Sequence, residues 1–241
     1  AMARYKPKFF YTIPTFQNPT GCTMSLAKRR KVAQLANEYG VYILEDDPYG
    51  SLRYTGQALP AIASFETGGK AVHLCSFSKT VSPGLRVGLV AASPEVLGAM
   101  AVNKQGADTH TSNLSQAVVD TYIREGHYFK HIEQVLPSYR RQLNAMLDSF
   151  CHFPHGIKHT LPEGGLFVWC ELPQGIDTVE LAKQAVERKV AYVPGVFFYP
   201  DGGHANTMRL NFSASDPESI DLGMQRLGSL CVQAMEQNGR R

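Results

Sequence analysis

Short apolar runs alternate with amphipathic stretches through the first half of the chain. The runs are rich in aromatic and β-branched residues and only four or five residues long, which is typical of buried strands. They cover residues 9–13, 41–44, 71–75 and 89–92. Because helical patterns separate several of them, we expect a mostly parallel α/β sheet whose ligands gather at the carboxyl ends of the strands.

Capping residues mark the ends of the expected helices. Ser25 is suited to cap a helix that ends before Gly40, and Ser93 precedes the start of another helix. A third helical pattern covers residues 113–125, and a long fourth pattern follows it. Pro137 lies inside this long pattern, where we expect it to kink or restart the helix.

The pattern changes after residue 150, where strands and turns become more frequent. The expected elements are strands at 165–170 and 208–212, a helix at 178–188 and a closing helix capped by Asp216. This change predicts two domains. We expect a larger domain at residues 1–126 and a smaller α+β domain at residues 127–241.

Composition and charge are those of a globular protein with a sizeable core. The 241 residues are 44% hydrophobic, and the net charge of +3 arises from interspersed acidic and basic residues, which argues against a nucleic-acid-binding arm. The one basic run, at residues 28–31, falls in a helical pattern, and we expect it to form a solvated face. No apolar run approaches the length of a membrane span, so we expect no membrane partner.

The cysteines and histidines do not form a known metal-binding pattern. The five cysteines are odd in number and include no C-x-x-C pair, which argues against a disulfide framework or a zinc site and fits a cytoplasmic location. His152, His155 and His159 lie close together in an expected loop, but no carboxylate or cysteine completes a known ligand spacing. We therefore expect no bound metal.

The candidate chemistry lies in residues 76–88, Ser-Phe-Ser-Lys-Thr-Val-Ser-Pro-Gly-Leu-Arg-Val-Gly, between two expected strands. A lysine amine condenses with an aldehyde to give a Schiff base, whereas hydroxyls and a guanidinium hold phosphate oxygens. Lys79 supplies the amine, and Ser76, Ser78 and Arg86 are candidate phosphate ligands. Pyridoxal 5'-phosphate has both an aldehyde and a phosphate, so we expect it to be the cofactor.

Other polar residues follow neighbouring apolar runs. Asp46 with Tyr49, and Asn18, come just after two expected strands, so strand order predicts that they converge with Lys79. A carboxylate beside the cofactor's ring nitrogen keeps that nitrogen protonated, and Asp46 fits this role. Arg209 lies within an apolar strand, where a buried guanidinium requires an anion.

Two motifs resemble those of fold type I pyridoxal-phosphate enzymes, and of class I/II aminotransferases in particular. They are S-x-S-K-x-x-x-P-G-x-R-x-G at residues 76–88 and N-P-T-G at residues 18–21. The resemblance implies an aspartate aminotransferase-like fold, with the C-terminal part of a large domain on a mostly parallel sheet and a smaller α+β domain. It also implies a homodimer.

The same resemblance implies roles for individual residues. Asp46, which stands three residues before a tyrosine, would contact the ring nitrogen, and Tyr49 and Asn18 would contact the phenolic oxygen of the cofactor. Arg209, together with Asn18, would bind the substrate, with the arginine on its α-carboxylate. Lys79 would hold the cofactor as a Schiff base and then move the Cα proton while an amino group passes between an α-amino acid and a 2-keto acid.

Within this family, residues 16–21 and 45–49 are most similar to the branch of 2-aminoadipate and kynurenine aminotransferases, although Pro48 replaces a more usual alanine. Such enzymes have a substantial segment before the N-P-T-G loop, so we expect this chain to be a truncated form. One alternative is the pyridoxal-phosphate-sensing domain of a GntR-type transcriptional regulator, which would bind nucleic acid only through an upstream winged helix. Another is a pyridoxal-phosphate lyase or decarboxylase.

Overall fold

The computed structural model describes residues 2–239, and the side chains of residues 2–237. By contact density the chain divides into two compact units. The first comprises residues 1–15 and 23–135, and the second comprises residues 16–22 and 136–241. The domain boundary expected after residue 126 lies close to this division, and the assignment of two functional domains stays a prediction.

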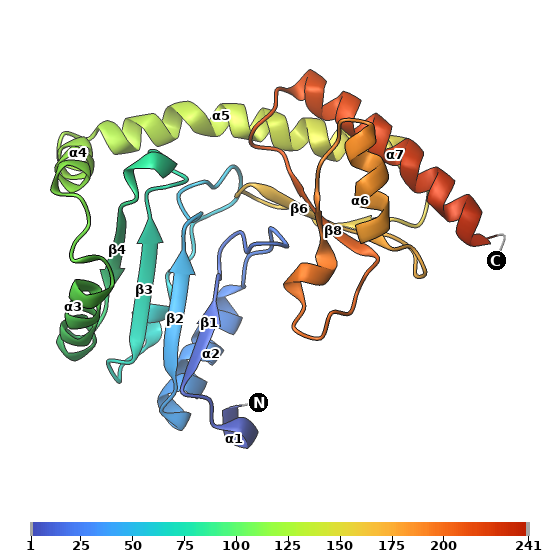
Figure 1. The fold of residues 1–241 in the computed structure, drawn as a ribbon. Helices are drawn as coiled ribbons and strands as arrows, with labels where there is room; N and C mark the ends of the chain where they lie inside the picture. Colours follow the sequence, from blue (N-terminus) through green and yellow to red (C-terminus); the bar gives the residue numbers. More distant parts are fainter. Residues whose placement is uncertain (1, 240–241) are drawn as a thin grey trace. The chain divides into compact units, whose positions relative to one another are not determined.

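The first unit is built on a four-stranded sheet in the order β1-β2-β3-β4 (Figure 1). Its strands are β1 (Phe9–Thr12), β2 (Tyr42–Asp47), β3 (Ala71–Ser76) and β4 (Gly88–Ala91). The first three are parallel, and β4 is antiparallel to β3. The expected mostly parallel sheet is therefore confirmed.

Strand β2 is longer than its apolar run predicts. We expected the strand to end at residue 44, but it continues through Glu45 and Asp46 to Asp47. The extension follows from pairing on both sides, because Glu45 is opposite Thr12 of β1 and Asp47 is opposite Cys75 of β3. The acidic residues thus belong to the end of the strand and alternate between its two faces.

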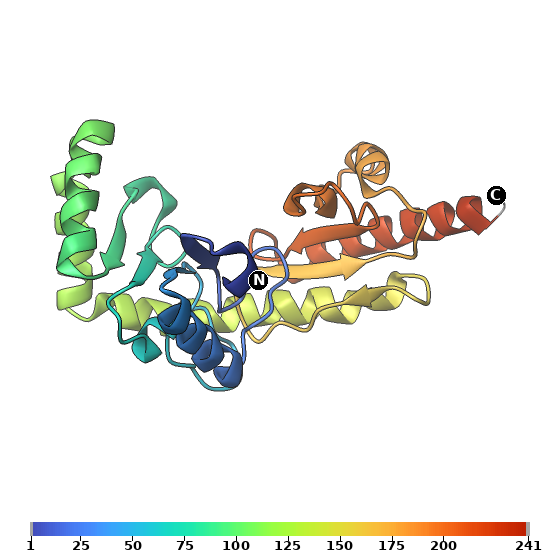
Figure 2. The ribbon, with the colours of Figure 1, turned by 90° about the horizontal axis from the view of Figure 1, so that it is seen from below.

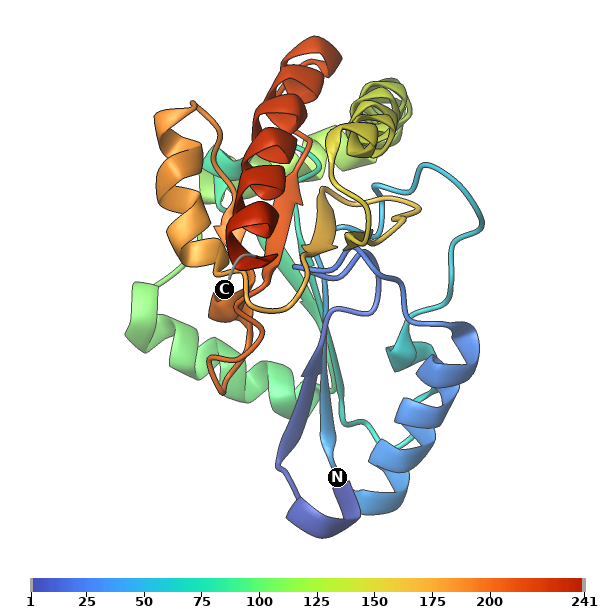
Figure 3. The same cartoon turned by 90° about the vertical axis from the view of Figure 1, so that its right-hand side faces the viewer.

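Helix α2 (Leu26–Tyr39) packs on one face of this sheet, as Figure 3 shows. Its N-cap is Ser25, and Gly40 follows it with a φ of 68°, so both expected ends are confirmed. The helix buries Ala33 and Ala36 against Ile43 of β2 and Ile62. The remaining helices of the unit are α1 (Met2–Tyr5), η1 (Ile62–Phe65), η2 (Pro83–Leu85), α3 (Pro94–Asp108) and α4 (Asn113–Arg124).

Arg29 of α2 contradicts the expectation of a solvated basic face. Its side chain is only 1% exposed. The guanidinium donates to the carbonyl oxygens of Met24, Pro60 and Pro14 at 2.9 to 3.1 Å and to Oγ1 of Thr15 at 2.8 Å. Arg29 therefore ties two loops together, the one between β1 and α2 and the one between β2 and η1, and only the rest of the 28–31 run is exposed.

Helix α5 (His127–Asp148) runs without interruption through Pro137, so the expected restart is wrong. A proline removes one backbone donor and crowds the preceding turn. Here a strongly amphipathic pattern on both sides of Pro137 offsets that cost, and residues such as Ile132 and Leu143 are buried.

The second unit has an antiparallel sheet in the order β5-β6-β8-β7, whose central strands β6 and β8 lie side by side in Figure 2. Its strands are β5 (Lys158–His159), β6 (Phe167–Glu171), β7 (Val193–Pro194) and β8 (Thr207–Asn211). Its helices are η3 (Ser149–His152), α6 (Thr178–Glu187), η4 (Gly195–Phe198) and α7 (Pro217–Gly239). Asp216 accepts the Ser219 N–H at 2.9 Å, which confirms it as the cap of α7.

Within residues 2–239, no helix combines the length and the apolar character that crossing a membrane requires.

Candidate active site

Asp46 lies near the carboxyl end of β2 and accepts a hydrogen bond from Tyr11 of β1. The distance from the Tyr11 hydroxyl to Oδ2 of Asp46 is 2.7 Å. Partial burial of the phenol and this hydrogen bond raise the pKa of Tyr11 to about 12, so the hydroxyl remains a donor at neutral pH. Tyr11 was not among the predicted site residues, although its position one strand away from the acidic run was available as a signal.

Strand alternation separates Asp46 from its acidic neighbours. Glu45 and Asp47 are on the face opposite to Asp46, and Asp47 accepts the Gly50 N–H at 2.9 Å through Oδ1. This bond closes the turn after β2, in which Tyr49 is 5% exposed. Asp46 is therefore the one carboxylate of the three that shares a face of the sheet with Tyr11.

The last residue of β3, Ser76, and the loop that follows it hold the four other residues predicted for the first unit. The Phe77 carbonyl accepts the N–H groups of Val81 and Ser82, and the Phe77 N–H donates to Val87. This pattern folds residues 77–87 into a compact loop across the ends of β3 and β4. Lys79 and Arg86 are exposed on this loop, whereas Ser76 and Ser78 are half-buried.

Two local features shape this loop. Oγ of Ser76 accepts the Ser78 N–H at 3.2 Å, which fixes the first turn. Arg86 follows the short helix η2 with a φ of 54°, a left-handed conformation that is uncommon for an arginine. Since β2 and β3 are neighbouring parallel strands, Asp46 and the lysine loop lie at the same edge of the sheet. The structure thus brings these predicted residues to one edge.

The other two predicted residues meet in the second unit. Nη1 of Arg209, on β8, donates to Oδ1 of Asn18 at 2.7 Å. The guanidinium also lies over the ring of Phe167 at 4.3 Å from its centroid, and over that of Phe198 at 5.2 Å. These contacts orient the guanidinium of Arg209, and a planar guanidinium is suited to bind a carboxylate through two hydrogen bonds.

The loop that contains Asn18 is held against β6 by a close fit at Gly21. This glycine has a φ of 68°, and a Cβ there would lie 2.5 Å from the Phe167 carbonyl oxygen. The left-handed conformation costs a residue with a side chain about 1–2 kcal/mol, and the clash adds to this. Any side chain at position 21 would therefore displace the loop.

We expect Gly21→Ala to lower the free energy of unfolding by about 2–4 kcal/mol. Urea denaturation monitored by circular dichroism measures this change. Gly223→Ala is the matched control, because a Cβ at Gly223 of α7 meets nothing within 4 Å. That substitution should instead stabilise the protein by up to about 1 kcal/mol, since alanine favours the helix. Similar effects of the two substitutions would contradict the fit described at Gly21.

The first unit has a mostly parallel sheet with a lysine loop and a carboxylate at one edge, and the second unit has an arginine on a central strand. Both features are typical of pyridoxal-phosphate-dependent transferases. The sequence matches the family described as aminotransferase class I and II over residues 5–227. The chain therefore belongs to this family, whose members use pyridoxal phosphate.

Individual relatives of the chain are also described as aminotransferases. The chain is 41% identical to aromatic-amino-acid aminotransferase 1 of Thermococcus litoralis, covering 96% of this chain and 56% of the relative. The crystal structure of α-aminoadipate aminotransferase from Thermus thermophilus, complexed with N-(5'-phosphopyridoxyl)-L-leucine, superposes with a TM-score of 0.92 at 38% identity, covering 98% of this chain and 61% of that one.

The chain is also similar to a protein described as a transcriptional regulator. The HTH-type transcriptional regulator YjiR of Escherichia coli is 32% identical, covering 98% of this chain and 50% of the relative. The chain thus spans about half the length of the curated relatives it matches.

Proposed function

We propose that this chain is part of an aminotransferase that moves an amino group between an α-amino acid and a 2-keto acid. The observation that supports this most strongly is the loop after β3, in which Lys79 is flanked by Ser76, Ser78 and Arg86 at the same sheet edge as Asp46. A reactive amine, three phosphate ligands and a carboxylate form one donor set, and they fit pyridoxal phosphate.

Each residue of this set has a task that its chemistry allows. Lys79 is exposed and is the point of covalent attachment, while Arg86 and the two serine hydroxyls bind phosphate oxygens. Asp46 holds a proton on the ring nitrogen, and the Tyr11 hydroxyl keeps its carboxylate oriented. When bound, pyridoxal phosphate supplies the electron sink for breaking the Cα–H bond of an amino acid.

Three other residues orient the reactants. Tyr49 and Asn18 would hold the phenolic oxygen side of the cofactor through hydrogen bonds, and Arg209 would bind the substrate α-carboxylate. The hydrogen bond of Arg209 to Asn18 and its contacts with two aromatic rings support this role, because they hold the guanidinium in one orientation. Once released, Lys79 moves the Cα proton of the substrate.

A second candidate function is cofactor sensing in a transcriptional regulator, which the similarity to YjiR favours. Such a domain would bind pyridoxal phosphate through the same residues without needing to turn over an amino acid. The two candidates therefore share the attachment site and differ in turnover.

Borohydride reduction tests the attachment site. After incubation of the full chain with pyridoxal phosphate and reduction, we expect peptide mass mapping to find the label on Lys79. Lys104, which pairs with Asp108 at 2.8 Å on exposed helix α3, serves as the matched unlabelled lysine. A label on another lysine, or none, would overturn the proposal.

Turnover then separates the two candidate functions. An aminotransferase releases a 2-keto acid when an amino acid is added to the loaded protein, and a sensor does not. Keto-acid release after labelling of Lys79 supports the enzyme, whereas labelling without release supports the regulator.

A further inference from the structure

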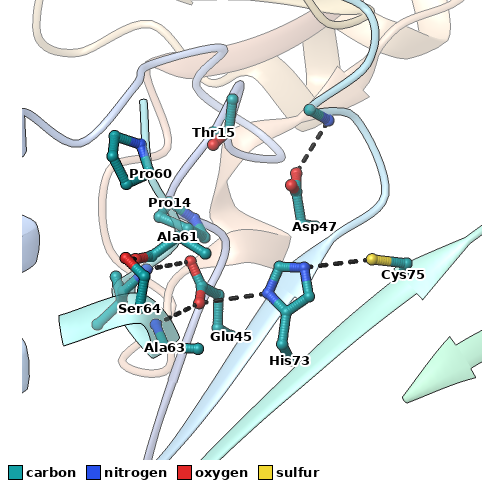
Figure 4. A network of polar contacts seen from close by, with 12 residues as sticks. Pro14, Thr15, Glu45, Asp47, Pro60, Ala61, Ala63, Ser64, His73 and Cys75 are labelled. Carbon is teal, nitrogen blue, oxygen red and sulfur yellow. Dashed lines mark hydrogen bonds and ion pairs between the residues drawn. The ribbon is translucent and has the colours of Figure 1, made fainter. Parts of the chain in front are cut away.

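A thiol, an imidazole and a carboxylate stand in line on the face of the first sheet opposite to Asp46 (Figure 4). Sγ of Cys75 lies 3.2 Å from Nε2 of His73, and Nδ1 of the same ring lies 3.3 Å from Oε2 of Glu45. Cys75 and His73 are alternate residues of β3, and Glu45 is opposite His73 on β2. Strand register thus places the thiol, the imidazole and the carboxylate in this order.

Glu45 is fixed as a carboxylate at the end of this line. It is 1% exposed and accepts the Ile62 N–H at 2.8 Å and the Ala63 N–H at 2.9 Å. Burial alone would raise its pKa, but the contacts with His73 and with these two N–H groups lower it below the usual range. The acid is therefore ionised at neutral pH.

The imidazole is correspondingly basic. The contacts of His73 with Cys75 and then with Glu45 outweigh its burial and raise its pKa to about 10. Two further charged groups act on this site. Burial raises the pKa of Asp47, and its carboxyl group interacts with the imidazole of His73. Arg29 interacts with both Asp47 and Glu45. His73 is thus a cation at neutral pH, and its Nε2–H is placed to stabilise negative charge on the Cys75 sulfur.

The thiol opens onto a cavity of about 240 Å³ that is built entirely from the first unit. Phe77, Tyr128 and Phe129 give it apolar walls, and Thr80 also lines it. Thr80 is 5% exposed, and its hydroxyl has no hydrogen-bond partner among the described residues. A buried hydroxyl without a partner is costly, so the cavity offers a hydrogen bond to a small polar ligand.

We propose that Cys75, activated by His73 and Glu45, is a modification site that reacts with small uncharged hydroperoxides entering this cavity. The carboxylates of Glu45 and Asp47 disfavour anionic ligands on this face, and the apolar walls disfavour cations that would arrive hydrated. A hydroperoxide is small and neutral and has oxygens that bond to the Thr80 hydroxyl.

The reaction balances with the groups present. The Cys75 proton passes to solvent while the protonated His73 stabilises the thiolate through Nε2–H, and the thiolate sulfur attacks one peroxide oxygen. An S–O bond forms as the O–O bond breaks, the sulfur is oxidised by two electrons, and the leaving oxygen is reduced. That oxygen takes the proton from His73 and departs as water or an alcohol, which leaves a sulfenic acid that an added thiol reduces.

Hydrogen peroxide and the sulfenic-acid trap dimedone test this site in the full chain. Cys22 and Cys151 are exposed free thiols and provide internal controls. With substoichiometric peroxide at pH 7, we expect mass spectrometry to find Cys75 labelled at least about tenfold faster than either control. Equal or slower labelling of Cys75 would overturn the proposal, whatever the variants show.

His73→Gln then tests the activation. We expect it to reduce the rate at Cys75 to that of the exposed controls and to make the rate rise with pH between 6 and 9, as it does for an unassisted thiol. The control is His110→Gln, which removes an exposed histidine that does not line the cavity. An unchanged rate and pH profile in His73→Gln, with circular dichroism confirming the fold, would refute the role of the imidazole.

Discussion

Replacing Asp46 with alanine is expected to lower the kcat/KM of transamination at least a hundredfold in the full-length protein, while pyridoxal phosphate is retained. The carboxylate holds the charge on the ring nitrogen that the chemical step requires, and one preorganised electrostatic contact of this kind contributes roughly a factor of a hundred to a thousand. The phosphate ligands Ser76, Ser78 and Arg86 are untouched. Steady-state kinetics and the cofactor absorbance after gel filtration measure the two effects separately.

Tyr11→Phe is the control for this substitution. It removes the 2.7 Å hydrogen bond to Asp46 but leaves the carboxylate in place. One hydrogen bond to a charged group contributes about 1.5–3 kcal/mol at most, so the loss of kcat/KM should be smaller than in Asp46→Ala. If the two variants lose the same activity, the ionised carboxylate is not the important group and our assignment of Asp46 is wrong.

Replacing Arg29 with methionine is expected to lower the free energy of unfolding by about 3–5 kcal/mol. Methionine fills a similar volume, but it donates no hydrogen bonds to the carbonyls of Met24, Pro60 and Pro14 or to the Thr15 hydroxyl. Of these four hydrogen bonds, those to Pro14 and Thr15 are buried and the other two are part-buried, and Glu45 would lose a favourable positive charge nearby. Urea denaturation gives the change in the free energy of unfolding. The slope of this free energy against urea concentration is compared between the variant and the parent protein.

The neighbouring residue Arg30 provides a stringent control. It is exposed on the same helix and makes only a cation–π contact with Phe65, at 5.4 Å from the ring centroid. Arg30→Met should therefore change the free energy of unfolding by no more than about 1 kcal/mol. Equal losses in the two variants would mean that the buried hydrogen bonds of Arg29 contribute little.

Sequence patterns predicted best what local interactions determine. The caps at Ser25 and Asp216 and the glycine at position 40 set helix ends through bonds within one turn, so the expected ends agree with the structure. The restart expected at Pro137 does not occur, because the local cost of the proline is offset by packing along α5, and the expected kink stays a prediction. Likewise, the burial of Arg29 depends on carbonyl groups of loops distant in the sequence, and the charge pattern of residues 28–31 does not predict it.

The residues of the candidate site also fall into two groups, those that local spacing predicts and those that only the folded sheet brings together. Lys79, its serines and Arg86 occupy one loop, so their spacing in the sequence predicts the group directly. Tyr11 reaches Asp46 across 35 residues, and the pairing of His73 with Glu45 depends on the register of two strands. A sequence shows that such residues lie on strands, but the register that aligns them is decided by the packed sheet.

The loop of residues 16–22 has a consequence for how the protein is made. It belongs to the second unit, yet Arg209, which bonds to Asn18, follows it by 191 residues. At a synthesis rate of about 5–20 residues per second, this loop leaves the ribosome roughly 10 to 40 seconds before its partner strand. The second unit therefore cannot finish folding until nearly the whole chain has been translated, and a ribosome stalled after residue 135 would hold a first unit whose inserted loop still has no partner.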